Sequence, residues 1–155
     1  PFYLYVGRVS KEKNIQAFLD AEVEGYKIIV GDGPLLKDLK EKYKNNKTVL
    51  FTGTLTGQDL VYWYQISDVF VFPSKSDTFG LVMLEALACG TPVAGYPVTG
   101  PIDIVHPSVG CLDTNLTTAI NNAIMCNRTV CRNYAVEYDW EKMVRIFESY
   151  CKNLY

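Results

Sequence analysis

The sequence predicts an α/β protein with a Rossmann-like, doubly wound and mostly parallel sheet. Short apolar runs rich in β-forming residues alternate with segments in which apolar residues recur at helical spacing. Turns containing glycine or proline separate these segments. The chain has 155 residues, of which 48% are hydrophobic. This length and composition suit one domain with a buried core, so we expect residues 1–155 to form a single domain.

The first half of the chain contains three predicted strand–helix pairs. The strands are expected over 2–6, 26–30 and 49–52, and the helices over 14–24, 35–43 and 58–66. The first helix carries Ile15, Phe18, Leu19 and Val23 at helical spacing. Pro34 is expected at the first position of the second helix, with Asp32 as its cap.

The second half repeats the pattern around one well-marked unit. Asp68–Phe72 is predicted to be a buried strand stopped by Pro73, and Leu81–Ala88 a helix that ends at Gly90. The apolar surface of this helix is expected to include Leu81, Leu84 and Ala88. Further strands are expected over 92–95 and 110–112, with a short helix near 102–105. Two or three helices close the chain, one over 116–125 and one over 140–154, the latter capped by Asp139.

The composition argues against several classes of protein. A net charge of -2 provides no basic field for nucleic acid. The cysteines number five, an odd count without a Cys-x-x-Cys pair, and the single histidine is His106. Neither a zinc site nor a disulfide framework is therefore predicted. No apolar run is long enough to cross a bilayer and no signal peptide is visible, so we expect a reducing, cytoplasmic location.

Four loops rich in glycine or small polar residues should rise from the carboxyl ends of the strands, over 7–14, 31–34, 53–57 and 74–79. Ligands of doubly wound sheets bind at that edge, so one composite site is expected. The N–H groups of Phe79, Gly80 and Leu81 at a helix start favour an anion such as phosphate. Arg8 and Lys13 suit a diphosphate. Alternatively, they are simply two cations on the protein surface.

Two acids flank that helix start. Asp77 and Glu85 would repel a phosphate and are better suited to the hydroxyls of an attached sugar or ribose. Alternatively, Asp77 caps the helix and Glu85 faces solvent. Because an unpaired carboxylate is costly in a buried apolar helix, a lone Glu85 there favours a functional role.

The stretch Ser74–Val93, with Asp-Thr-Phe-Gly followed by Leu-Glu-Ala and Gly-Thr-Pro-Val, resembles the donor-site signature of glycosyltransferase family 4. Those proteins are retaining nucleotide-sugar transferases of GT-B fold. The family pattern is Glu, seven residues, Glu, whereas the first acid here is Asp77. The turn Gly7-Arg-x-x-x-x-Lys13-Asn also resembles the family's diphosphate-binding turn. The resemblance extends from Gly7 to the last helix.

By this resemblance the chain is the C-terminal, donor-binding domain of a transferase whose N-terminal acceptor domain is absent. Arg8 and Lys13 would neutralise the diphosphate, Glu85 would hold the ribose and Asp77 the donor sugar. The main chain of Leu55 would meet the base. The remaining expected contacts with the donor are Gly7, Gly31, Thr78, Phe79, Gly80 and Leu81.

The resemblance implies transfer of a hexose-type sugar from a UDP- or GDP-linked donor, without metal or cofactor, to a glycan, lipid or protein. Membrane association would come only through the missing part, and this fragment alone is expected to be inactive. The first rival hypothesis is a non-catalytic nucleotide- or sugar-binding or regulatory module, which Asp77 in place of glutamate favours. A receiver-like or cofactor-binding domain would need an acidic cluster after the first strand or a GxGxxG loop, and the sequence has neither.

Overall fold

The computed structural model describes residues 1–76 and 80–137. The predicted contacts Asp77, Thr78 and Phe79, and the predicted final helix with its cap Asp139, lie outside the described residues.

A six-stranded sheet forms the centre of the fold, in the order β3-β2-β1-β4-β5-β6, and every adjacent pair is parallel. Crossovers of this kind require helices between the strands, as the sequence predicted. The strands are β1 (Phe2–Val6), β2 (Tyr26–Val30), β3 (Val49–Gly53), β4 (Val69–Phe72), β5 (Val93–Gly95) and β6 (Gly110–Leu112).

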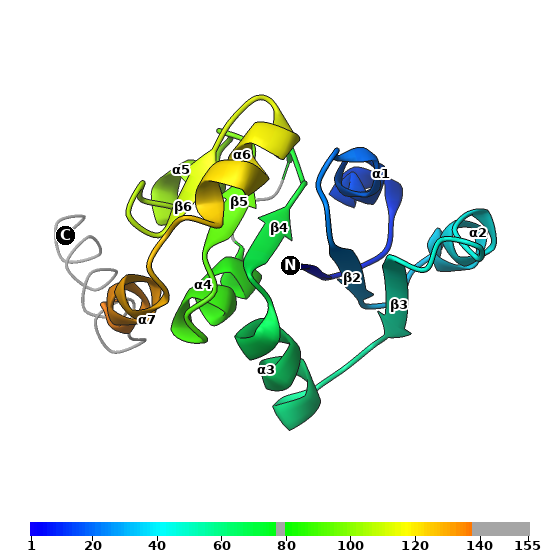
Figure 1. Ribbon diagram of the computed structural model, residues 1–155, viewed down its shortest axis with the longest axis horizontal. Helices are drawn as coiled ribbons and strands as arrows, with labels where there is room; N and C mark the ends of the chain where they lie inside the picture. The colour runs from blue at the N-terminus through cyan, green and yellow to red at the C-terminus, as the bar shows by residue number, and fades with distance from the viewer. Residues whose placement is uncertain (77–79, 138–155) are drawn as a thin grey trace, which may run out of the picture.

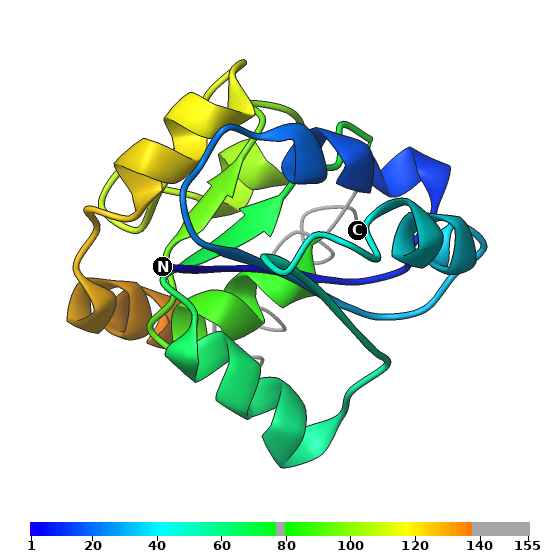
Figure 2. The same ribbon diagram turned by 45° about the vertical axis from the view of Figure 1, so that its right-hand side comes forward.

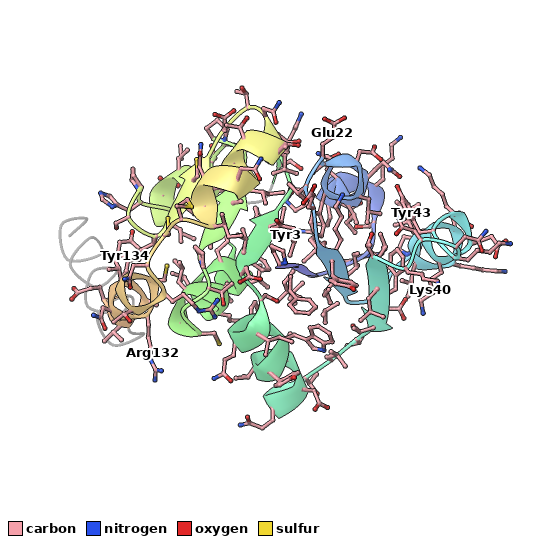
Figure 3. All side chains as sticks on the ribbon, viewed as in Figure 1. Tyr3, Glu22, Lys40, Tyr43, Arg132 and Tyr134 are labelled. Atoms are coloured by element: carbon pink, nitrogen blue, oxygen red, sulfur yellow. The ribbon has the colours of Figure 1, made fainter. Side chains whose placement is uncertain are left out.

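Helices cover both faces of the sheet, as the doubly wound prediction requires (Figures 1 and 2). One face carries α1 (Ile15–Asp20), α2 (Leu36–Lys42) and α6 (Leu116–Ala123), whose buried residues form one core cluster. The other face carries α3 (Gly57–Ile66), α4 (Leu81–Ala88), α5 (Pro101–Ile104) and α7 (Arg128–Val136). In Figure 3, Tyr3 lies in the middle of the molecule, whereas Lys40 and Arg132 lie at its periphery.

The first helix is shorter than predicted because a lysine from the next strand intervenes. α1 ends at Asp20, not at Glu24. The buried Lys27 donates hydrogen bonds from Nζ to the carbonyl oxygens of Leu19 and Ala21, at 2.7 and 2.6 Å. These carbonyls lie at the helix end, where a cation is favoured.

The predicted start of the second helix is also wrong. α2 begins at Leu36, so Pro34 precedes it by two residues. Asp32 does not cap the helix, because its Oδ1 accepts a hydrogen bond from the N–H of Gly33, at 2.6 Å. The Leu35 N–H instead donates to the carbonyl of Val9, so this turn is bound to the loop after β1.

The buried side of α4 differs from the predicted one. Met83, Ala86 and Leu87 are buried, whereas Leu81 is 45% exposed. Because α4 is apolar on nearly all sides, its pattern does not single out one face.

A helix that no range in the prediction covered, α7, packs against α4. α7 begins after Asn127, whose side chain accepts hydrogen bonds from the N–H groups of Thr129 and Val130. This cap is the local signal in the sequence that marks the start of the helix.

β1 and β4 lie side by side at the point where the strand order reverses. Their ladder contains two register pairs, Tyr3 with Val69 and Leu4 with Phe70. Past Leu4 and Phe70 the two strands continue to Val6 and Phe72 without further register pairs. The strands therefore separate toward their carboxyl ends, the edge where doubly wound sheets bind ligands.

Candidate functional site

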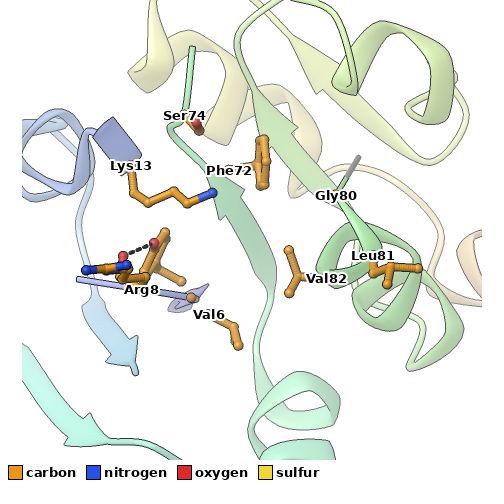
Figure 4. A pocket seen from close by; sticks show the side chains of 10 residues that line it. Val6, Arg8, Lys13, Phe72, Ser74, Gly80, Leu81 and Val82 are labelled. Atoms are coloured by element: carbon orange, nitrogen blue, oxygen red, sulfur yellow. Dashed lines mark hydrogen bonds between the residues drawn. The ribbon is translucent and has the colours of Figure 1, made fainter. Parts of the chain in front are cut away.

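A cavity of about 330 Å³ opens between the carboxyl ends of β1 and β4. Figure 4 shows Arg8 and Lys13 on one side and Leu81 and Val82, at the start of α4, on the other. The remaining lining residues include Tyr5, Val6, Gly7, Phe72, Ser74 and Gly80. The cavity thus occupies the switch point of the sheet.

A second cavity of about 280 Å³ continues along the same edge, over the ends of β2 and β3. Val6, Gly7 and Arg8 line both cavities. The new lining residues come from the next two loops and are Val30, Gly31, Asp32, Thr54 and Leu55. Together the two cavities bring together the predicted residues Gly7, Arg8, Lys13, Gly31, Leu55, Gly80 and Leu81.

Backbone hydrogen bonds hold the loops of the second cavity together. The N–H of Gly7 donates to Val30 O at 3.0 Å, and the N–H of Gly31 donates to Gly53 O at 2.8 Å. Gly31 has a φ of +138°, and a Cβ at this position would lie 1.9 Å from the carbonyl oxygen of Gly7. Only glycine permits this close approach, so Gly31 lets the loop after β2 pack directly against the loop after β1.

The loop after β1 supplies two positive charges to the first cavity. The Tyr5 hydroxyl donates to the carbonyl oxygen of Arg8 at 2.8 Å, which fixes the turn. Lys13 ends the 3₁₀ helix η1 (Lys11–Lys13), and Figure 4 shows its amine directed toward the cavity. A hydrogen bond from Ser10 lowers the pKa of Glu12, and the charges of Arg8 and Lys13 add to this effect.

The N-terminus of α4 forms the opposite wall. The N–H groups of the first helical turn have no partner within a helix and carry its partial positive charge. Gly80 is buried at the N-cap position, and its carbonyl accepts from the N–H of Met83 at 2.9 Å. Leu81 and Val82 line the cavity, so their N–H groups lie beside it. An anion in this cavity would be attracted from both walls.

Glu85 lies one turn further along α4 and lines neither cavity. Glu85 is exposed, in agreement with the alternative that it faces solvent, and its Oε2 accepts from the Tyr64 hydroxyl at 2.9 Å. It is therefore not the buried, unpaired carboxylate that favoured a functional role. Burial raises the pKa of Tyr64, and the negative charge of Glu85 raises it further. Because positions three and four apart share a helix face, Glu85 lies on the same face of α4 as Leu81 and Val82.

Several contacts of the site were not predicted. The buried Tyr64 donates to Glu85, and this bond joins α3 to α4. Asn14 donates from Nδ2 to the carbonyl oxygen of Pro73, beside the first cavity. The Lys13-Asn14 pair was visible in the sequence, but its partner lies 59 residues away. His106 is an exposed loop residue, and its Nδ1 lies 2.9 Å from Ser108 Oγ.

The described residues contain few features of other kinds of site. Within residues 1–76 and 80–137, no group of three His, Cys, Asp or Glu side chains is placed to hold a metal ion. Four cysteines in this part of the chain are unpaired thiols, namely Cys89, Cys111, Cys126 and Cys131. No helix in the described ranges is long and apolar enough to span a bilayer.

Comparison with known proteins gives relatives of one kind. Residues 1–127 match the family "Glycosyl transferases group 1". The sulfoquinovosyl transferase SQD2 of Arabidopsis thaliana is 41% identical over 108 residues, which cover 68% of this chain and 21% of that protein. A GDP-mannose-dependent alpha-mannosyltransferase of Corynebacterium glutamicum is 37% identical over 110 residues, covering 70% and 26%. The chain therefore corresponds to about a quarter of the length of these two relatives.

Solved structures show the same fold. The apo form of the lipopolysaccharide outer core galactosyltransferase WaaB superposes with a TM-score of 0.83 at 18% identity, over 99% of this chain and 49% of that one. Anabaena Alr3699/HepE in complex with UDP superposes with a TM-score of 0.74 at 23% identity, over 99% and 48%. The Rossmann-like fold predicted for one half of a GT-B glycosyltransferase is confirmed. By its sequence match and its fold, this chain belongs to the glycosyl transferases group 1 family.

Proposed function

We propose that this chain is the donor-binding part of a retaining glycosyltransferase and holds a nucleotide diphosphate sugar across the two cavities. The observation that carries the proposal is the first cavity, where Arg8, Lys13 and the start of α4 enclose one space at the switch point. Two cations and a helix N-terminus around one space suit a diphosphate better than any neutral group.

The diphosphate is the leaving group of the proposed transfer. Arg8 offers a planar set of donors and Lys13 a compact charge, while the N–H groups of Leu81 and Val82 lie across the cavity. As the bond between sugar and diphosphate breaks, negative charge grows on the diphosphate oxygens. These groups, fixed before the reaction, stabilise that charge and so provide the main catalytic contribution. With cations and a helix end in these positions, the proposed transfer needs no divalent metal.

The nucleoside extends into the second cavity. Leu55 is half-buried beside Thr54 at the end of β3, so its main chain is available to the edge of a base. Gly31 lines this cavity, and its lack of a side chain lets the loop after β2 pack against the Gly7 carbonyl. Glu85, held by Tyr64, accepts hydrogen bonds from the ribose hydroxyls in this proposal. The UDP complex of Anabaena HepE, a protein of the same fold, supports a nucleotide as the ligand.

The donor is a hexose-type sugar linked to UDP or GDP, and Asp77 is proposed to contact the sugar. The acceptor, a glycan, lipid or protein, is bound by an N-terminal domain, which is also the part through which any membrane association occurs. The transfer takes place in the cytoplasm. This chain by itself is expected to bind the donor without turning it over. Sugar transfer by the isolated chain would contradict the proposal that the acceptor is bound by a separate N-terminal domain.

Calorimetric titration of the chain with UDP, GDP and ADP, with and without magnesium, tests the donor site. We expect one nucleotide to bind equally well in both conditions, and Arg8→Ala to weaken it by about tenfold or more, as loss of a charged hydrogen bond does. Arg132→Ala, an exposed arginine on α7, is the matched control and should bind normally. Failure of the unaltered chain to bind all three nucleotides, or binding only with magnesium, would contradict the proposal.

A second experiment separates an enzyme from a non-catalytic module of the same fold. The full-length protein that contains this chain is incubated with candidate donors, and hydrolysis or transfer is followed by mass spectrometry. Turnover that Glu85→Gln abolishes supports the enzyme. Tight nucleotide binding without turnover supports the binding module.

A further inference from the structure

The first cavity exists because the two central strands separate. The β1–β4 ladder ends at Leu4 and Phe70, and the cavity is lined by Val6 and Phe72, further along the same strands. The loop bearing Arg8 and Lys13 follows one strand, while the segment leading to α4 follows the other. A contact beyond the end of the ladder is therefore needed to fix the distance between the two walls.

Asn14 makes such a contact. Its Nδ2 donates to the carbonyl oxygen of Pro73 at 3.1 Å, and the bond is part-buried. The residue before it, Lys13, and the residue after Pro73, Ser74, both line the cavity. The side-chain amide of Asn14 thus joins the two walls of the first cavity, at positions next to the lining residues.

The backbone at Asn14 holds the amide in this direction. Its φ is 53° and its ψ is 35°, and among the non-glycine residues that the structure describes it alone has a positive φ. Asparagine is among the few residues that tolerate the left-handed region. The Asn14 N–H donates to Lys11 O, and its carbonyl accepts from the N–H of Ala17 at 3.0 Å, so both neighbouring turns fix this residue.

The same side chain also meets the end of a third strand. Tyr96, buried directly after β5, has its pKa raised by burial, and a hydrogen bond with Asn14 opposes this rise. The amine of Lys75 lies 4.6 Å from the centre of the Tyr96 ring, which ties the segment after β4 to the same group. Asn14 is therefore part of a small network that spans the loops after β1, β4 and β5.

We propose that Asn14 is a positioning residue that holds the cation-bearing loop at a fixed distance from Pro73 and Ser74 after β4, so that the diphosphate site is formed before the donor binds. The inference rests on the proposed function of the first cavity. A preformed site binds more tightly because the ligand does not have to order the loops. Asn14 itself lines neither cavity, so its effect is exerted through Lys13 and Ser74, which line the first cavity.

Asn14→Gly tests this role with little backbone strain, because glycine adopts the left-handed region freely. We expect the affinity for the nucleoside diphosphate to fall by about tenfold, the upper range for one lost hydrogen bond. The affinity for the matching nucleoside, titrated by NMR chemical shifts, should stay the same. Asn14→Asp keeps the shape but cannot donate, and its negative charge also repels the diphosphate, so it should weaken diphosphate binding at least as much as Asn14→Gly does. Asn46→Gly is the matched control, because Asn46 bonds to Thr48 ahead of β3, at the opposite edge of the sheet.

Hydrogen exchange of the ligand-free chain gives a readout that does not depend on nucleotide. Amides over residues 8–13 and 74–76 should exchange faster in Asn14→Gly than in the unaltered chain, while those of β2 and β3 should not change. Unchanged exchange together with unchanged diphosphate affinity would overturn the inference and leave the proposed function standing. An equal loss of affinity for nucleoside and diphosphate would also overturn it. If exchange rises as expected but the unaltered chain binds no nucleotide, the proposed function fails, and Asn14 has only the structural role of joining the loops after β1 and β4.

Discussion

Gly31 provides the sharpest test of how the loops at the carboxyl edge are built. A Cβ at Gly31 would lie 1.9 Å from the carbonyl oxygen and 2.9 Å from the carbonyl carbon of Gly7. These are backbone atoms, so they cannot rotate away as the end of a side chain could. The φ of +138° adds strain for any residue with a Cβ. Gly31→Ala should therefore both destabilise the fold and push apart the loops after β1 and β2, which line the second cavity.

A second glycine gives the reference for the magnitude. Gly53 ends the neighbouring strand with a φ of +79°, and a Cβ there would have no atom within 4 Å. Gly53→Ala should cost about 1–2 kcal/mol, the penalty for a left-handed alanine. Gly31→Ala incurs in addition the overlap with Gly7, which is about 1–3 kcal/mol for overpacking. The two variants should thus differ by about 1–3 kcal/mol, with Gly31→Ala the less stable.

Thermal unfolding followed by circular dichroism measures this difference directly. In a domain of this size 1 kcal/mol corresponds to about 2–4 °C, so Gly31→Ala should melt about 2–12 °C below Gly53→Ala. Gly31→Ala should also bind nucleotide more weakly at a temperature where both variants are folded. Equal melting temperatures would refute the argument, because they would mean that the Gly7 carbonyl moves aside without cost.

Three further outcomes are expected. Tyr64→Phe removes the donor that orients Glu85, so the preference for a ribonucleotide over its 2′-deoxy analogue should fall by about threefold to tenfold in calorimetry. An unchanged preference would mean that Tyr64 has no role in recognising the ribose. Lys27→Met leaves two carbonyls without their donor and should lower the free energy of unfolding in urea by about 1–3 kcal/mol, whereas the exposed Lys47→Met should change it by less than about 0.5 kcal/mol. Burial raises the pKa of the Cys131 thiol from 9.0 to about 11, so iodoacetamide should alkylate it more slowly than Cys126 at pH 8, as mass spectrometry would show. Since this pKa is raised in the folded state, the associated stability is complete below pH 9 and lost as the pH rises through 11. Equal alkylation rates would contradict this.

The sheet and the location of the site could be predicted because both depend on local patterns. The run Val69–Phe72 is wholly apolar and stops at a proline, which is typical of a strand buried on both faces. Loops that follow parallel strands must meet at one edge, so Arg8, Lys13, Gly31 and Leu55 were expected to converge before any coordinates were known.

The remaining features depend on contacts between distant segments. The end of α1 is set by Lys27 from the next strand, and no pattern inside the helix records that. The buried side of α4 could not be chosen, because apolar residues surround the helix and α7 arrives from much later in the chain. The exposure of Glu85 and its bond to Tyr64 depend on how α3 meets α4, 21 residues apart along the chain.

The short ladder between β1 and β4 has a consequence for the order of folding. β1 and β2 share five register pairs within the first 30 residues, whereas β1 and β4 share two pairs between segments some 66 residues apart. Pairings between strands that are near in the sequence close small loops and form first. Pairings between strands that are far apart in the sequence lose more chain entropy before their stabilising contacts form. The pairing of β1 with β4, which joins the two halves of the sheet, should therefore be among the last steps of folding. A nucleotide that bridges the join would mainly slow unfolding, leaving the rate of folding nearly unchanged.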